Sequence, residues 1–207
     1  MADKPWLRDT YLCFTNLPFH PVTLDIWRYY MVELGFYASQ LMTLPFDEKR
    51  KDYLAQMTHH VVTIGLLVGS WTSGTIRVGS LVLLVHDCAD IFLQLAKLLR
   101  YFKSPAATFQ KVFVVFVVTW ILTRLVYFPL YINIPATETA RNNPRFSSCF
   151  VSKALIFLLW SLFCLHLYWT VLLFRAIYRA VVLKREVEDN RSEDEDSDSD
   201  EVDKKSE

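Results

Sequence analysis

Cysteine and glycine are scarce in this sequence, which has four Cys and five Gly among its 207 residues. The cysteines form no CxxC pair and lie mostly in apolar surroundings, which argues against a metal-binding or disulfide framework. We therefore expect small buried thiol side chains at Cys13, Cys88, Cys149 and Cys164. The first residues also lack an uninterrupted apolar run, so no cleavable signal peptide is expected.

Apolar residues are abundant: 53% of the sequence is hydrophobic, 15% is aromatic, and the mean hydropathy is positive. This composition is unusual for one soluble domain and typical of a chain that crosses a membrane several times. Five apolar spans can be distinguished. They predict an all-α, polytopic membrane helical bundle with about five transmembrane helices, approximately Leu24 to Leu44, Leu54 to Ser73, Val78 to Leu99, Phe109 to Ile132 and Phe150 to Leu183.

The formal net charge of zero conceals a basic body and an acidic tail. Residues 184–207 contain twelve Asp or Glu and five Lys or Arg, so this segment carries −7 and the remainder +7. Such a segment cannot bury a core, which predicts a membrane domain over residues 1–183 and a disordered acidic tail over 184–207. Two interpretations of the tail stay open: a solvated segment, or phosphorylation at Ser192 and Ser197, each followed by an acidic residue three positions later.

Basic residues predict the orientation in the membrane. They cluster at residues 49–51, at Arg100 and Lys103 between the third and fourth spans, and at the end of the last span. If the spans alternate in direction, these clusters share one side, which the positive-inside rule makes cytosolic. The C-terminal tail is then cytosolic, and the sequon at Asn190 is expected to stay unglycosylated.

Polar residues interrupt the second and third spans with helical periodicity. On a helix turning 100° per residue, one face of the second span carries His59, Thr63, Leu66, Ser70 and Gly74, with His60 at its margin. An arc of about 100° on the third span carries His86, Asp87, Asp90, Gln94 and Lys97. The gap between the two spans is short and contains Ser73 and Gly74, which predicts an antiparallel hairpin whose polar stripes face each other.

Ionisable side chains inside a bilayer are costly, so the two stripes are where function is expected. Imidazole can act as a general base or a nucleophile, and a neighbouring carboxylate orients the ring and stabilises its protonated form. Histidine and aspartate also bind zinc or iron, but the HH pair and the HDxxD group offer few neutral nitrogens, so no metal is expected. Two other roles stay open: hydrogen bonds that only hold helices together, and a relay for protons or ions.

The stretch from His59 to Tyr101 resembles the longevity-assurance motif of the ceramide synthases, which belong to the TLC-domain superfamily. The matching positions, with their spacing intact, are His59, His60, Leu66, Ser70, Arg77, Gly79, Leu81, His86, Asp87, Asp90, Ala96, Lys97 and Tyr101. The upstream run from PWL to NLPFHPVTLDIWRYYMVELGFY, the DEKRKDY loop, the TRLVYFPL segment and the acidic Ser-containing tail are similar to that family too.

The resemblance implies a multi-pass enzyme of the endoplasmic reticulum that transfers a fatty acyl group from acyl-CoA to the amino group of sphinganine or sphingosine, giving dihydroceramide or ceramide. It implies catalytic roles for His59, His60, His86, Asp87 and Asp90, and substrate binding by Ser70, Arg77, Gln94 and Lys97. One member of the His59/His60 pair would take the acyl group as an acyl-imidazole or act as the base toward the amine. A simpler alternative for Lys97 is that its side chain extends to the cytosolic surface of the membrane.

The implied partners are the lipid bilayer, acyl-CoA as co-substrate and a sphingoid base, with no further cofactor and no nucleic acid; a homo- or hetero-dimer is left open. The implied loop before the last span, which influences acyl-chain length in the family, runs from about Asn133 to Ser147. A noncatalytic TLC-domain protein that binds lipid or assists translocation is the alternative function.

The sequence departs from the family pattern at three places. Around Gly74 an expected Asn is replaced, and Gln94 stands where a Glu is expected, which removes a negative charge but retains hydrogen bonding. Family members usually begin with two further spans, and this chain starts downstream of them, so the TLC-type domain is expected to be incomplete at its N-terminus.

Overall fold

The computed structural model describes residues 4–15, 17, 19–46 and 52–182, so the predicted tail at 184–207 lies outside the described residues. Within those ranges every regular element is helical, which confirms the all-α prediction. The elements are α1 (Pro5–Arg8), η1 (Thr10–Cys13), α2 (Leu24–Thr43), η2 (Leu44–Phe46), α3 (Tyr53–Thr72), α4 (Ile76–Tyr101), α5 (Ala106–Trp120), η3 (Ile121–Asn133), α6 (Ile134–Asn142), α7 (Pro144–Ser147) and α8 (Phe150–Val182).

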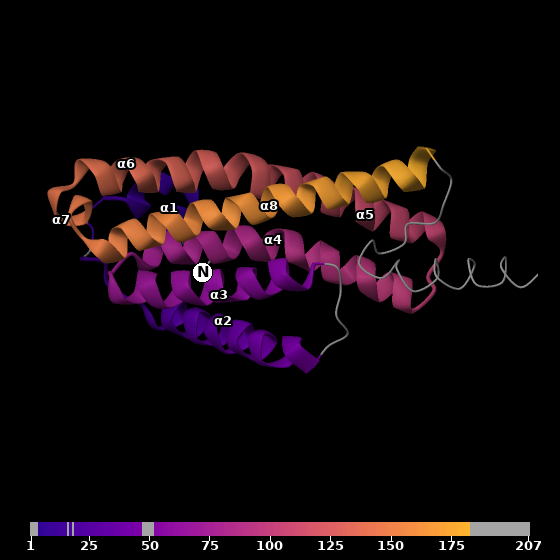
Figure 1. The fold of residues 1–207 in the computed structure, drawn as a ribbon, viewed down its shortest axis with the longest axis horizontal. Helices are drawn as coiled ribbons and strands as arrows, with labels where there is room; N and C mark the ends of the chain where they lie inside the picture. Colours follow the sequence, from indigo (N-terminus) through magenta and orange to yellow (C-terminus); the bar gives the residue numbers. More distant parts are fainter. Residues whose placement is uncertain (1–3, 16, 18, 47–51, 183–207) are drawn as a thin grey trace, which may run out of the picture.

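The long helices lie lengthwise beside one another in an elongated bundle (Figure 1). α3 packs against α2, α4 and α8, while α4 also packs against α5 and η3. α8 closes the bundle by packing against η3 and α6 as well as α3. Side chains from α3, α4, η3 and α8 therefore meet in its interior, and α2 covers the outer side of α3.

Three helices of the described chain are long and apolar enough to cross a membrane: Ile76–Tyr101, the continuous helix Ala106–Asn142, and Phe150–Arg179. The other two expected spans are present as α2 and α3, each of 20 residues, or about 30 Å at 1.5 Å per residue. That these two also cross the membrane stays a prediction. Large apolar side chains on the outer faces, such as Val118, Leu122, Phe157 and Val171, are exposed, as expected of surfaces that meet lipid.

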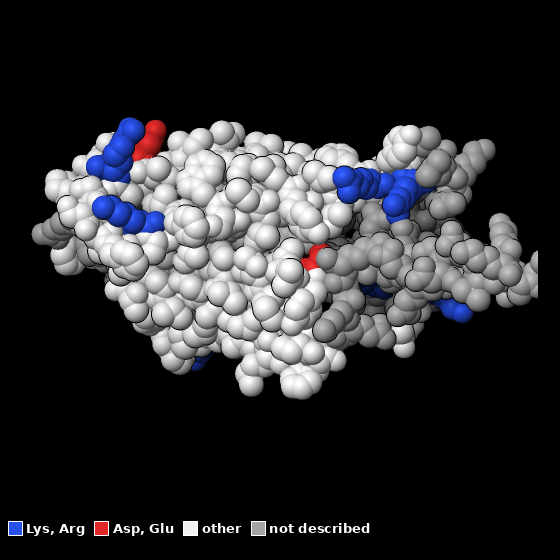
Figure 2. All heavy atoms as spheres, in the orientation of Figure 1, with Lys and Arg blue, Asp and Glu red and all other residues white. Residues whose placement is uncertain are grey.

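Charged side chains are confined largely to the two ends of the face shown in Figure 2. Lys and Arg gather at both ends, and a broad uncharged band, interrupted by one acidic spot, separates them. This distribution fits a membrane belt around the bundle. The basic residues 49–51 lie outside the described ranges, so the cytosolic side stays a prediction.

The predicted antiparallel hairpin is confirmed. α3 ends at Thr72, α4 begins at Ile76, and the two helices pack against each other. Gly74 has a φ of 73°, a left-handed conformation that glycine adopts at no steric cost. The Gly74 N–H donates to Trp71 O at 3.3 Å and the Thr75 N–H to Ser70 O at 2.9 Å, which together form a Schellman motif that ends α3.

The fourth span is longer than predicted. The helix that was expected to end near Ile132 continues through η3 and α6 to Asn142, so most of the expected loop at 133–147 is helical. η3 is a π-helix with Pro129 inside it, and the Ile134 N–H bonds Pro129 O, five residues earlier. Proline has no N–H and crowds the turn before it, and the wider π-turn accommodates it without breaking the helix. Sequence periodicity does not reveal this adjustment.

The expectation of four buried cysteines is wrong for two of them. Cys13 is buried and Cys149 is half-buried, but Cys88 and Cys164 are exposed on α4 and α8. On helices that face lipid, the outer surface is apolar too, so an apolar sequence context does not distinguish a core thiol from a lipid-facing one. All four lie in the described ranges and are free thiols.

Candidate functional site

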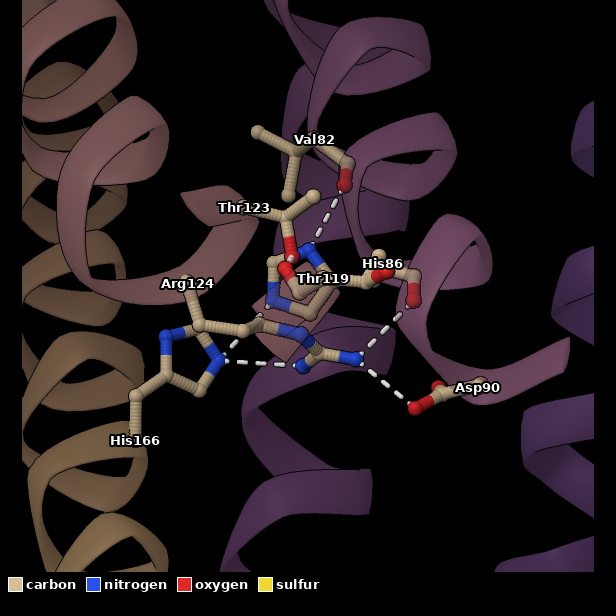
Figure 3. A network of polar contacts seen from close by, with 7 residues as sticks. All are labelled: Val82, His86, Asp90, Thr119, Thr123, Arg124 and His166. Atoms are coloured by element: carbon tan, nitrogen blue, oxygen red, sulfur yellow. Dashed lines mark hydrogen bonds and ion pairs between the residues drawn. The ribbon is translucent and has the colours of Figure 1, made fainter. Parts of the chain in front are cut away.

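A buried arginine organises the polar interior. Arg124 is the fourth residue of η3 and is 2% exposed. Its Nη2 donates to Asp90 Oδ1 at 2.8 Å and to the main-chain oxygen of His86 at 3.0 Å, and its Nη1 lies 3.2 Å from His166 Nε2. The guanidinium also stacks on Trp120, 4.9 Å from the ring centroid. In Figure 3 it extends between the His166 ring and the Asp90 carboxylate, joining η3, α4 and α8.

His86 is buried and both of its ring nitrogens are engaged by the protein. Its Nδ1 lies 2.6 Å from Val82 O and its Nε2 lies 3.0 Å from His166 Nε2. A carbonyl oxygen can only accept, so Nδ1 of His86 carries a proton and donates it to Val82. Neither ring nitrogen of His86 is therefore open to a substrate in this arrangement.

His59 and His60 differ from His86 in this respect. The Nδ1 atoms of both are buried and have no hydrogen-bond partner within the described residues. The two rings lie edge to face at 5.5 Å, and the Tyr37 ring on α2 contacts both, at 6.0 Å from His59 and 5.9 Å from His60. Of the three predicted catalytic histidines, these two retain a nitrogen for chemistry on a substrate.

Trp169 on α8 fixes the position of the His59 ring, against which it packs at 5.3 Å. The indole N–H of Trp169 donates to Asp52 Oδ2 at 3.2 Å, and Asp52 is itself 1% exposed at the start of α3. The Asp52 carboxylate thus connects the end of the DEKRKDY segment to α8. His59 is held between aromatic rings from α2 and α8.

Acidic residues from two helices lie on the α2 side of the cluster. The Tyr29 hydroxyl on α2 donates to Asp87 Oδ2 on α4. Glu33, one turn further along α2, is close enough to Asp87 and Asp90 to interact with their charges. The Asp90 side chain is 40% exposed, whereas its partner Arg124 is almost fully buried. The carboxylates therefore form the outer, more open side of the site.

A narrow, mostly apolar cavity of about 50 Å³ extends away from the cluster between α3, α4 and α8. Tyr37, Thr63 and His86 line one end of it, and Ser70 and Thr75 line the other. From His86 to Thr75 is about 16 Å along α4 at 1.5 Å per residue. Leucine and valine side chains form the walls between them: Leu66, Leu67, Val78, Val82, Leu83, Leu155, Leu159 and Leu162. The lining is apolar, as expected of a surface that contacts hydrocarbon.

The structure thus brings His59, His60, His86, Asp87 and Asp90 to one region and does not bring all four predicted substrate-binding residues there. Ser70 lies at the far end of the cavity, where its hydroxyl is 3.2 Å from the Tyr30 hydroxyl. Arg77 lies in the first turn of α4, 13 residues before Asp90. Its Nη1 donates to Leu12 O at 3.3 Å, and its guanidinium stacks 4.6 Å from the Trp6 ring centroid.

Gln94 and Lys97 are exposed on α4. In an antiparallel pair joined at 73–75, Lys97 lies beyond the first residue of α3. The last turn of the predicted polar stripe therefore extends past the end of α3. A role for Gln94 and Lys97 in binding substrates stays a prediction.

The residues that sequence reasoning missed are Arg124, His166, Tyr29, Tyr37, Asp52 and Trp169. For two of them a signal exists: Arg124 and His166 are isolated ionisable residues inside the fourth and fifth apolar spans. Such residues mark functional positions as strongly as the HH and HDxxD groups do. The aromatic residues carry no such signal, because the sequence has 31 Phe, Tyr and Trp residues in total.

Among the described residues, no group of three or more His, Cys, Asp or Glu is arranged as metal ligands. The guanidinium of Arg124 beside His86 and His166 also opposes a cation at that pair. The chemistry open to these residues is that of imidazole nitrogens and carboxylates beside an apolar cavity: nucleophilic attack, proton transfer and stabilisation of charge.

Comparison with known proteins identifies the family of this chain. Residues 1–175 match the TLC domain family, and the chain belongs to that family. It is 40% identical over 188 residues to ceramide synthase hyl-1 of Caenorhabditis elegans, covering 86% of this chain and 51% of that protein. It is 37% identical over 202 residues to mouse ceramide synthase 4, covering 95% of this chain and 49% of that protein.

A plant relative is covered more completely. Ceramide synthase LOH2 of Arabidopsis thaliana is 34% identical over 206 residues, covering 94% of this chain and 67% of that protein. The chain thus spans about half the length of the two animal relatives and two thirds of the plant one.

Proposed function

We propose that this chain carries the active site of a sphingoid-base N-acyltransferase, which makes dihydroceramide or ceramide from fatty acyl-CoA and sphinganine or sphingosine. The observation that carries the proposal is the pair of Nδ1 atoms of His59 and His60 that have no hydrogen-bond partner among the described residues, on rings that contact the cavity-lining Tyr37. The relatives are named ceramide synthases, which favours this function over a noncatalytic TLC-domain protein that binds lipid or assists translocation.

The proposed division of labour follows from which atoms are occupied. His59 or His60 attacks the thioester carbonyl, or takes the proton from the amine, because each has a ring nitrogen without a protein partner. His86, whose two ring nitrogens are engaged, lines the cavity and positions its neighbours. Asp90 balances the charge of Arg124, and Asp87, held by Tyr29, adds negative charge on the open side, where a cationic amine would approach.

The substrates fit the two environments of the site. The apolar cavity, whose walls contain leucine and valine, contacts part of one hydrocarbon chain. The polar groups that react lie at the end lined by Tyr37, Thr63 and His86, next to the histidine pair. Acyl-CoA is the co-substrate, its nucleotide part remaining in the cytosol, and no further cofactor takes part. The protein is proposed to be a multi-pass protein of the endoplasmic reticulum membrane with a cytosolic C-terminus.

Acyl transfer by purified protein in lipid nanodiscs tests the proposal, with sphinganine and a panel of acyl-CoA lengths. Wild-type protein is expected to form dihydroceramide, and His59→Ala and Asp90→Ala are expected to lose at least about 100-fold in rate, the usual contribution of a positioned acid or base. Thr58→Ala, an exposed position next to His59, serves as the matched control and keeps the wild-type rate. Undiminished product from both site variants would remove the catalytic assignment. Lipid binding without product by the wild-type chain would favour the noncatalytic alternative.

A further inference from the structure

His166 on α8 is a fully buried histidine that no part of the proposed reaction yet uses. Its ring packs against Phe128 at 5.1 Å and Trp120 at 6.1 Å, which holds its Nε2 between His86 and Arg124. This single atom lies 3.0 Å from His86 Nε2 and 3.2 Å from Arg124 Nη1. Figure 3 shows both contacts converging on it.

The two contacts require different protonation states of His166 Nε2. Arginine only donates, so the Arg124 contact requires a lone pair on that nitrogen. His86 already carries its proton on Nδ1, where it donates to Val82, so a neutral His86 has a lone pair on Nε2 and requires a proton on His166 Nε2. No neutral state of the two rings satisfies both contacts at once.

Adding one proton removes the conflict. If His86 carries a proton on each nitrogen, it donates to Val82 and to His166, and His166 then needs its own proton on Nδ1. The His166 Nε2 lone pair in that state faces two donors, one from His86 and one from Arg124. The Asp90 carboxylate, 2.8 Å from Arg124, balances the guanidinium, so the protonated pair leaves one net positive charge in the cluster. Nδ1 of His166 is buried and has no hydrogen-bond partner among the described residues, so it is the open end of the pair.

We propose that His166 is a positioning residue that changes tautomer, so that the His86–His166 pair stores one proton during the reaction. In the empty state His166 is protonated on Nε2 and donates to neutral His86. On proton uptake, His166 gains a proton at Nδ1 and passes its Nε2 proton to His86 Nε2. The pair gains one proton in total, and His86 becomes the cation. The reverse transfer returns the pair to its first state and delivers the proton to the thiolate of CoA, the leaving group of the reaction.

This inference rests on the proposed function for the source of that proton. An amine loses a proton when it forms an amide, and the pair lies beside the histidines that would carry out the transfer. The charged and titratable groups that face His166 are His59 from α3, His86 from α4 and Arg124 from η3, with Asp90 on α4 reached through Arg124. Of these groups, His59 also belongs to the reacting histidine pair, so the proposal assigns to it the transfer of the proton between the substrate and the pair.

His166→Gln separates proton storage from a purely structural role. The Gln amide N–H can donate to His86 and its oxygen can accept from Arg124, so the packing and both contacts are retained, but the side chain cannot change tautomer or titrate. We expect the variant to unfold near the wild-type temperature, to keep its KM for acyl-CoA, and to lose about 10- to 100-fold in kcat, with a displaced acid limb in the kcat–pH profile. Cys164→Ala, an exposed position on the same helix, is the matched control. A His166→Gln protein with the wild-type kcat and pH profile would overturn the proposal.

A second measurement needs no substrate. In 15N-histidine-labelled full-length protein in nanodiscs, the signals that disappear in His166→Gln identify His166. They are expected to change from the Nε2–H to the Nδ1–H tautomer as the pH falls and His86 becomes protonated. A single His166 tautomer at every pH at which the protein is folded overturns the proposal. Because this experiment involves no turnover, a wild-type chain that makes no ceramide would refute the proposed function and leave this test decisive.

Discussion

Nη2 of Arg124 lies 2.8 Å from Oδ1 of Asp90, and this ion pair joins the π-helical part of the fourth span to α4. The pair is asymmetric, because the guanidinium is 3% exposed and the carboxylate side chain 40%. A buried cation in an apolar bundle is tolerated only when it is paired and hydrogen-bonded, and Arg124 also binds the His86 main-chain oxygen and stacks on Trp120. The positions of His86 and His166 therefore depend on an arginine that lies 34 residues beyond Asp90 in the sequence.

A double-mutant cycle on Arg124 and Asp90 is the first prediction. Asp90→Asn keeps a hydrogen-bond acceptor but removes the charge that balances the guanidinium, and it is expected to lower the free energy of unfolding by about 1–2 kcal/mol, since the carboxylate is partly open to solvent. Arg124→Met should remove the cation and its contacts. The double variant is expected to be more stable than the sum of the single losses, since no unpaired charge remains. Thermal unfolding in nanodiscs gives the four values. Additive losses would mean that the ion pair contributes nothing.

Arg77 is predicted to hold the N-terminal segment against the bundle. It donates to Leu12 O and stacks on Trp6, and next to it Cys13 is buried, which raises the pKa of the thiol to about 12. The thiolate is the reactive form, so wild-type Cys13 should react with a maleimide extremely slowly at pH 8. Arg77→Ala is expected to release the segment and to speed this reaction at least about tenfold, because relief of burial, the largest cause of the raised pKa, outweighs the loss of the Arg77 charge that lowers it.

Mass spectrometry of a chain whose other three cysteines are replaced by Ala measures the labelling rate. Arg100→Ala, an exposed arginine at the opposite end of α4, is the control. Equal labelling rates in the Arg77→Ala and Arg100→Ala proteins would contradict a structural role for Arg77 and favour the substrate-binding role that the sequence suggested.

Gly79 permits a close approach of α2 to α4. The Tyr30 hydroxyl donates to Ile76 O at 3.0 Å, and a Cβ on Gly79 would overlap this hydroxyl and lie 2.7 Å from Ser70 Oγ. Gly79→Ala is therefore expected to cost about 1–3 kcal/mol of stability through overpacking. Gly35→Ala is the control, since nothing lies within 4 Å of its Cβ position, and it should leave stability equal or raise it by up to about 1 kcal/mol.

Tyr30→Phe in the Gly79→Ala background tests the cause, because it removes the hydroxyl that the new methyl group meets. Chemical denaturation of each protein provides the comparison. If Tyr30→Phe does not reduce the loss of stability caused by Gly79→Ala, the strain does not come from the contact with the Tyr30 hydroxyl.

Sequence alone could predict the helices and part of the site, and the reason is physical. Apolar runs of about 20 residues and a 3.6-residue period are local properties, so α3, α4 and α8 begin and end close to their expected positions. The HH and HDxxD groups share helix faces for the same reason. His166 meets His86 across 80 residues, a contact set by helix packing. The π-helix that contains Arg124 and Pro129 has no periodic signature either.

Gly69 on α3 and Leu155 on α8 are predicted to set the width of the cavity and, through it, the preferred acyl-chain length. A Cβ on Gly69 would lie 2.7 Å from Leu155 Cδ2, and Leu155 lines the cavity. Gly69→Ala should therefore displace the Leu155 side chain toward the cavity and narrow it. Given the proposed acyl transfer, we expect the rate with long acyl-CoA to fall relative to short acyl-CoA by about tenfold, the effect of one or two methylene contacts.

Gly65→Ala provides a close control on the same helix. Its Cβ would meet Leu158 Cδ1 at 3.2 Å on the same α8 surface, but Leu158 is outside the cavity lining. It should change stability without changing the ratio of long to short products. Leu155→Ala should act in the opposite direction, because it enlarges the cavity at the same point. The ratio of long to short products is measured with an equimolar mixture of acyl-CoA lengths. The same ratio in Gly69→Ala, Leu155→Ala and wild type would show that Gly69 and Leu155 do not limit the length of the acyl chain.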